Sequence, residues 1–228
     1  SATAVGGLAF DVVYPPYAEE LIAEISPRTT EVGKSTRFLY AVRNKSQSGL
    51  QRGFDNFEIE TPLRVEEVGT IRIRHVDGSV NEADFSGLSL NELPVVRGDM
   101  RIEEVFDTRF RFSFPRIDQD GTVLEIEFEN GVLRFGTTFA GRAFNSEVET
   151  TLGQSALAGN AADMAVLGFD DGNVQPLGTP LAENLSVAVP ISRNLLANIN
   201  IQPSVFTPNG DGINDQSIVQ YDITNIVR

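Results

Sequence analysis

Apolar and polar residues alternate along most of this chain, and a two-residue period is typical of β-strands that bury one face. The pattern is sharpest at residues 109–114, where Phe110, Phe112 and Phe114 share one face. Comparable runs are rich in Phe, Val, Ile and Thr, and turn-forming Gly, Pro, Asn and Asp separate them. The runs span residues 8–13, 21–25, 36–42, 54–60, 64–76, 100–115, 122–128, 132–135, 185–190 and 195–201.

This series of about ten strands predicts an all-β chain folded as an antiparallel β-sandwich. Within it, Glu129–Gly131 has the composition of a tight hairpin turn between the runs 122–128 and 132–135. No sustained helical period competes with the strands. The best helical candidates are 84–93 and the alanine-rich segment 152–167, which is either a short helix or an ordered excursion between strands.

The chain shows no linker before residue 200, because it has no Pro/Ser-rich stretch and no run of like charges there. The clearest boundary is at Gln202–Pro203. We therefore expect one sandwich domain over residues 1–201 and a second segment over residues 202–228. Two smaller sandwiches that meet near residues 117–121 are the alternative.

Charge and composition exclude several classes of protein. The 228 residues carry a net charge of −14, which argues against a nucleic-acid partner because no excess of Lys and Arg can neutralise phosphates. The absence of cysteine excludes disulfides, thiolate metal sites and cysteine nucleophiles. No apolar run reaches the roughly 18 residues that cross a bilayer, so we expect no transmembrane segment. The start at Ser1, without Met, is typical of a secreted protein after removal of its signal peptide.

Catalytic motifs are lacking, and we expect no enzymatic activity. His75 is the only histidine, and it is predicted on a strand face. No G-x-S-x-G elbow and no phosphate-binding Gly loop occurs. Glutamates that alternate along two strands are predicted to face solvent, which is the ordinary position of charge on a sandwich. These are Glu58, Glu60, Glu125 and Glu127.

The densest group of oxygen donors lies between Phe206 and Asp215, in the string FTPNGDGIND. Gly212 is expected to make the tight turn between the donors. Carboxylate and amide oxygens on such a turn predict a small calcium site, although the spacing excludes an EF-hand. The candidate ligands are Asn209, Asp211, Asn214 and Asp215. The alternative is an Asx-turn loop whose carboxylates bond local backbone amides. Of two shorter acidic segments, 118–121 is interpreted as a hairpin turn and 170–173 as a turn.

The string FTPNGDGIND, followed by SIVQYDI, resembles the opening of C-terminal modules on large bacterial cell-surface proteins. One type is the Ig-like domain similar to that of the flagellar hook-cap protein, and the other is the gliding-motility-associated C-terminal module. The segments 53–68 and 133–145 resemble cohesin-like sandwiches. The resemblance implies an Ig-like or cohesin-like β-sandwich at the bacterial cell surface, with the first strand of a following Ig-like module at its C-terminus.

These observations lead to three hypotheses. The first is an extracellular structural or adhesive module with a calcium-stabilised junction to the next domain. The second is a homo-oligomeric filament or shell subunit, in which the amphipathic strand 217–223 or the apolar run 5–13 adds to the sheet edge of a neighbouring subunit. The third is a glycan-binding module, which the chain disfavours because it has no Trp and its four Tyr are scattered. Asn44 and Asn184 fit the N-glycosylation pattern.

Overall fold

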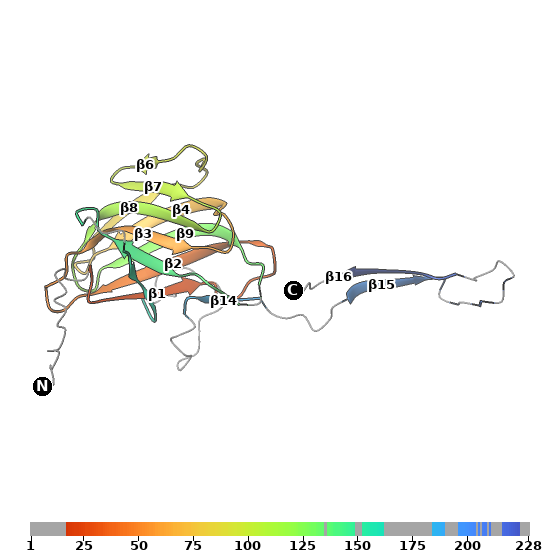
Figure 1. Cartoon of the computed structure of the whole chain (residues 1–228). Coiled ribbons are helices and arrows are strands. Elements are labelled where there is room, and N and C mark those ends of the chain that lie inside the picture. The colour runs from red at the N-terminus through yellow and green to blue at the C-terminus, as the bar shows by residue number, and fades with distance from the viewer. Residues whose placement is uncertain are drawn as a thin grey trace, which may run out of the picture. The chain divides into compact units, whose positions relative to one another are not determined.

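The computed structural model describes residues 17–134, 136–148, 152–161, 184–189, 196–203, 205, 207, 208, 210 and 216–223. Every regular element in this part of the chain is a β-strand (Figure 1). The chain divides into two compact units, Ser1–Val189 and Pro190–Arg228. Among the described residues, no helix has the length and apolarity needed to cross a membrane.

The larger unit is built from two six-stranded sheets. The first sheet has the order β13 (Leu157–Ala158), β1 (Glu20–Ser26), β2 (Ser35–Lys45), β9 (Val123–Gly131), β4 (Glu67–Arg74) and β5 (Val80–Asp84). The second has the order β12 (Gln154–Ser155), β11 (Gly141–Phe144), β3 (Phe54–Glu60), β8 (Arg109–Ile117), β7 (Met100–Val105) and β6 (Val95–Arg97). Neighbouring strands are antiparallel except β1 and β13, which are parallel. The expected all-β antiparallel sandwich is thus confirmed.

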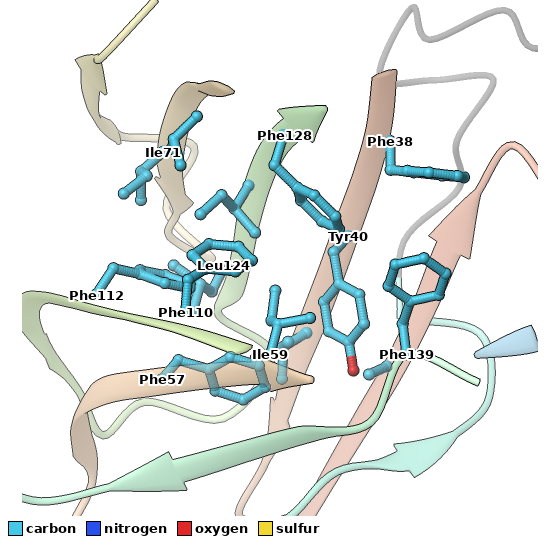
Figure 2. Packing of buried hydrophobic residues seen from close by; sticks show 14 of the residues in the cluster. Phe38, Tyr40, Phe57, Ile59, Ile71, Phe110, Phe112, Leu124, Phe128 and Phe139 are labelled. Carbon is cyan, nitrogen blue, oxygen red and sulfur yellow. The ribbon is translucent and has the colours of Figure 1, made fainter. Parts of the chain in front are cut away.

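Phenylalanine rings from both sheets fill the space between them (Figure 2). Phe110, Phe112 and Phe114 of β8 are buried, as the alternation predicts. Phe110 meets Phe128 of β9 across the two sheets, with ring centroids 5.2 Å apart. Such tilted aromatic pairs contribute about 0.5–1.5 kcal/mol beyond the burial of their area. The alternating pattern therefore encodes one continuous aromatic core.

The two halves of the larger unit are interleaved. Strand β2, from the first half, pairs with β9 from Ser35, opposite Gly131, to Arg43, opposite Val123. Because β8 lies in the second sheet and β9 in the first, the turn at residues 118–122 carries the chain from one sheet to the other. This excludes two small sandwiches that meet near residues 117–121.

The predicted hairpin at Glu129–Gly131 is wrong, because these residues lie inside β9. The fully buried Asn130 pairs with Thr36 of β2, and its side-chain amide donates to the carbonyl oxygens of Leu63 at 2.8 Å and Arg64 at 3.2 Å. A turn-forming residue is thus held in a strand by contacts from a distant loop. The chain then continues to β10 (Gly136–Thr138), which pairs with β14 (Ser186–Ala188) and not with β9.

Neither helical candidate is helical in its described residues. Residues 85–93 form turns and bends after β5. Residues 154–158 form β12 and β13, which Ala156 alone separates, so one segment pairs with an edge of each sheet. Residues 162–167 lie outside the described part. On one side of the sandwich, the edge strands β12 and β13 belong to one continuous segment that joins the two sheets. On the opposite side, the edge strands are β5 and β6.

The smaller unit contains an antiparallel ribbon of β15 (Leu196–Gln202) and β16 (Ile218–Ile223) (Figure 1). We expected residues 195–201 to close the sandwich, with a boundary between residues 201 and 202. In the structure the division falls between Val189 and Pro190, because β15 pairs with β16. The strand expected at 217–223 thus has a partner strand within the chain.

Candidate functional site

The predicted calcium ligands Asn209, Asp211, Asn214 and Asp215 lie outside the described residues, as does Gly212. The residues around them place the segment in the fold. Gln202 lies opposite Ile218, so residues 203–217 connect the two strands of the ribbon. At the base of this connection the Ser217 hydroxyl donates to the carbonyl oxygen of Pro203 at 3.3 Å. Gly210 has a φ of +77°, a left-handed conformation that glycine adopts at little cost.

The acidic segment 118–121 is a turn, but it is not the predicted hairpin turn, because β8 and β9 on its two sides lie in different sheets. Gly121 has a φ of +81°, and Thr122 donates its backbone N–H to the Gln119 carbonyl oxygen at 3.3 Å. Asp120 accepts the backbone N–H of Ser46 at 2.9 Å, which ties two loops together. Within the described residues, no three His, Asp or Glu side chains are grouped closely enough to hold a metal ion. The second acidic segment, 170–173, lies outside them.

The glutamates on the outer faces are not all solvent-exposed, which corrects the expectation for Glu125 and Glu58. Glu125 is only 1% exposed, and its two oxygens accept from Arg74 Nε at 2.6 Å and Arg72 Nη1 at 3.3 Å. Glu58 is also buried, and its Oε2 lies 2.9 Å from Arg111 Nη2. Because arginine side chains cover these carboxylates, they are engaged in ion pairs and are not available as a general acid and base.

The environment of Arg72 is dominated by carboxylates. Partial burial acts to lower its pKa, but hydrogen bonds and charge interactions with Glu82 and Glu125 outweigh burial, so the pKa of Arg72 is raised. Arg72 Nε lies 3.0 Å from Glu82 Oε2. A guanidinium that stays charged over the whole accessible pH range is suited to hold a buried carboxylate permanently.

Tyr40 places a polar atom in the aromatic core. Its ring lies among Phe57, Ile59 and Phe139, and its hydroxyl is buried without a hydrogen-bond partner (Figure 2). Burial raises the pKa of this phenol well above its ordinary value. A Cβ on Gly141 would lie 2.5 Å from the Tyr40 hydroxyl oxygen, so the close approach of β11 requires glycine. The site is a packing contact that no solvent reaches.

Three further sequence candidates are structural. His75 follows β4 directly in the turn to β5, and not on a strand face, and its Nε2 lies 3.0 Å from Asn81 Oδ1. Asn44 is fully buried and donates to the Gln119 carbonyl oxygen at 2.9 Å. Asn184 is buried as well, and it accepts from Arg28 at 2.8 Å. Because both asparagines are buried and hydrogen-bonded, neither is a site for glycosylation in the folded protein.

A polar pocket of about 530 Å³, which we call the β3–β10 pocket, lies at the end of β3, and no sequence motif indicated it. Charged residues from β3, β8, β11 and the segment before β10 line it, together with threonines. Arg142 Nη2 lies 2.8 Å from Glu60 Oε1, and Arg109 Nε lies 3.6 Å from Glu58 Oε2. Arg134 is exposed and forms no ion pair with the described residues. The pocket could have been found only from the fold, since these residues are far apart in sequence.

Neither the models of protein families nor the curated proteins give a match to this chain. The terminal motif and the geometry of the described residues are therefore the basis for a proposed function.

Proposed function

We propose that this chain is a non-catalytic structural or adhesive β-sandwich module of a bacterial cell-surface protein. In this proposal the second unit begins an Ig-like module, and calcium stiffens the connection between β15 and β16. The observation that carries it is the pairing of Gln202 with Ile218, which brings the two ends of the 203–217 segment together. A closed loop of this kind lets oxygen donors converge on one cation.

The sandwich supports a mechanical role. Its core is a continuous set of aromatic rings, and its outward carboxylates are engaged by arginines. Such an arrangement favours a stiff body of fixed shape, which suits a spacer between other domains. The net charge of −14 fits a soluble surface that attracts divalent cations.

Calcium titration tests the proposal. We expect the unfolding temperature of the β15–β16 ribbon, followed by the signals of its own residues in NMR spectra, to rise with calcium and to fall when EDTA is added. At ten times the dissociation constant, one calcium site stabilises the folded state by about 1.4 kcal/mol. The double variant Asp211→Asn, Asp215→Asn is expected to lose the effect.

The matched control is Asp118→Asn, Asp120→Asn, which removes the same charge from the turn at 118–121 in the sandwich. This variant is expected to keep the calcium response of the ribbon. A ribbon that gains no stability from calcium, or a response equal in both double variants, would overturn the calcium assignment.

The filament hypothesis is the second candidate, and the exposed apolar surface of the ribbon favours it. Ile199, Ile201, Ile218, Val219 and Tyr221 are between 49% and 66% exposed. Strand edges with apolar side chains and little charge are templates for addition of another strand. Residues 5–13, the other segment expected to add to a neighbour, lie outside the described part of the chain.

Sedimentation over a wide concentration range separates the two candidates. The filament hypothesis predicts assembly that Val219→Lys abolishes, because a lysine on an edge strand opposes pairing. Val96→Lys is the control, since Val96 is a comparably exposed residue on β6 of the sandwich. A protein that stays monomeric at every concentration, with the ribbon formed, would remove this candidate.

A further inference from the structure

We propose that the β3–β10 pocket binds an acidic oligosaccharide, with Arg134 as the residue that holds its carboxylate. The pocket's volume of about 530 Å³ falls within the range of about 300–1,000 Å³ typical of ligand sites. It lies entirely within the larger unit, so the inference is independent of the calcium loop and of the ribbon.

The charge in the pocket is opposite to that of the whole chain. Arg109, Arg134 and Arg142 line it together with Glu58 and Glu60. Glu60 is paired with Arg142, and Glu58 with Arg109 and Arg111, so Arg134 is the lining arginine that forms no ion pair with any described residue. In a protein of net charge −14, a cation without a partner at the rim of a pocket is a position for an anionic group. Guanidinium binds carboxylate through two parallel hydrogen bonds.

The remaining lining groups match a polyhydroxylated ligand. The ion pair of Arg142 and Glu60 is nearly half exposed, and it offers both donors and acceptors at its surface. Thr108 and Thr138 add exposed hydroxyls at two sides of the pocket. No aromatic residue is among the pocket's lining residues. An uncharged sugar would find no aromatic ring to stack on in this pocket. The affinity therefore has to come from the attraction between a charged sugar and the arginine.

An acidic peptide fits less well than a sugar. Extended peptides bind β-proteins by adding to a free strand edge. Two of the strands that line the pocket are paired on both edges, since β3 pairs with β11 and β8, and β8 pairs with β3 and β7. A further strand that lines the pocket, β10, pairs only with β14 among the described strands, but its three residues are too short an edge to hold an extended peptide.

Calorimetric titration with trigalacturonate, in EDTA to exclude calcium bridging, tests the inference. We expect binding to the acid form and at least tenfold weaker binding of its methyl ester, which lacks the charge. Arg134→Gln should weaken binding of the acid about tenfold, the effect of one lost charge-assisted hydrogen bond. Because Arg134 is exposed, its replacement should leave the unfolding temperature unchanged.

Arg101→Gln is the matched control, since Arg101 is an exposed arginine on β7 of the same sheet and does not line the pocket. It should bind the acid as the unchanged protein does. Three results would overturn the inference: no binding of the acid at millimolar concentration, equal losses in the two arginine variants, or equally tight, Arg134-dependent binding of hexaglutamate.

Discussion

At the scale of single residues, the Tyr40 hydroxyl is one of several buried polar atoms without a hydrogen-bond partner among the described residues. The Tyr40 hydroxyl is buried among hydrocarbon groups, whereas the Tyr17 hydroxyl donates to the Leu152 carbonyl oxygen at 3.1 Å. A buried polar group without a partner costs about 1–3 kcal/mol, while a formed hydrogen bond contributes about 1 kcal/mol. The two tyrosines should therefore respond in opposite ways to loss of the hydroxyl.

We predict that Tyr40→Phe leaves the free energy of unfolding unchanged or raises it by up to about 1 kcal/mol, because it removes an unpaired group. Tyr17→Phe should lower it by about 1 kcal/mol. Urea denaturation measures both. A loss above 1 kcal/mol in Tyr40→Phe would mean that a buried partner, such as a water molecule, satisfies the hydroxyl.

A second residue-scale prediction concerns the buried carboxylate of Glu125. Glu125→Ala leaves Arg72 and Arg74 facing each other without their shared anion, and it should lower the free energy of unfolding by about 3 kcal/mol. Glu82→Ala removes a carboxylate from the same Arg72, but this side chain is 59% exposed. Its loss should cost less than about 1 kcal/mol. Equal effects in the two variants would contradict a special role of burial.

At the scale of elements, long-range contacts decide the ends of strands. Asn130 belongs to the most turn-like tripeptide of its region, yet it lies in β9 because its amide bridges the carbonyl oxygens of Leu63 and Arg64. The alternation of the phenylalanines in β8 was sufficient to predict that strand. A two-residue period is local information, whereas the partner of a buried asparagine is known only from the fold.

We predict that Asn130→Ala lowers the free energy of unfolding by about 2 kcal/mol, since two carbonyl oxygens lose their donor in a buried setting. Asn81→Ala, at an exposed asparagine of β5, should change it by less than about 0.5 kcal/mol. Chemical denaturation of the two variants is the measurement. A small effect of Asn130→Ala would show that water replaces the amide.

The candidate sites were predictable to different degrees. The calcium loop is a sequence motif, and its ligands remain a prediction because they lie outside the described residues. The β3–β10 pocket could not be predicted, because Glu60, Arg109, Arg134 and Arg142 meet only when four separate segments are assembled. The class of fold was predictable, because alternating apolar and polar residues, separated by turn-forming residues, indicate an antiparallel sandwich. The place of β15 in the second unit could not be predicted, because it depends on the pairing of β15 with β16, and the sequence of one strand does not show its partner.

At the scale of the whole molecule, loop carboxylates couple stability to pH. Hydrogen bonds from Ser48, Ser79 and Ser86 lower the pKa values of Glu19, Asp77 and Asp84 respectively. Ser79 lies two residues after Asp77, and Ser86 lies two residues after Asp84. Ser48 bonds Glu19 across a contact between two loops. A lowered pKa in the folded state means that the charged form is favoured there more than in the unfolded chain.

The stabilisation is therefore complete above the ordinary carboxyl pKa values of about 4, and it is lost as the pH falls through the lowered values. We predict that the unfolding temperature falls more steeply below pH 4 in the unchanged protein than in Glu19→Gln, Asp77→Asn, Asp84→Asn. Thermal unfolding from pH 6 to pH 2 measures this. Parallel curves of unfolding temperature against pH would contradict the coupling. Because the two proteins differ in only three carboxylates, their comparison cancels most of the general effect of the net charge of −14.

The interleaving of β2 with β9 has a kinetic consequence for synthesis. Strands β3, β7 and β8 of the second sheet leave the ribosome before β9, the strand that joins β2 to β4 and completes the opposite sheet. Folds with such distant pairing form in about milliseconds to seconds, slowly for their size. Until β9 arrives, the phenylalanine face of β8 has no covering sheet. We expect the nascent chain to bind a chaperone at this stage, since the exposed phenylalanines would otherwise associate with other chains.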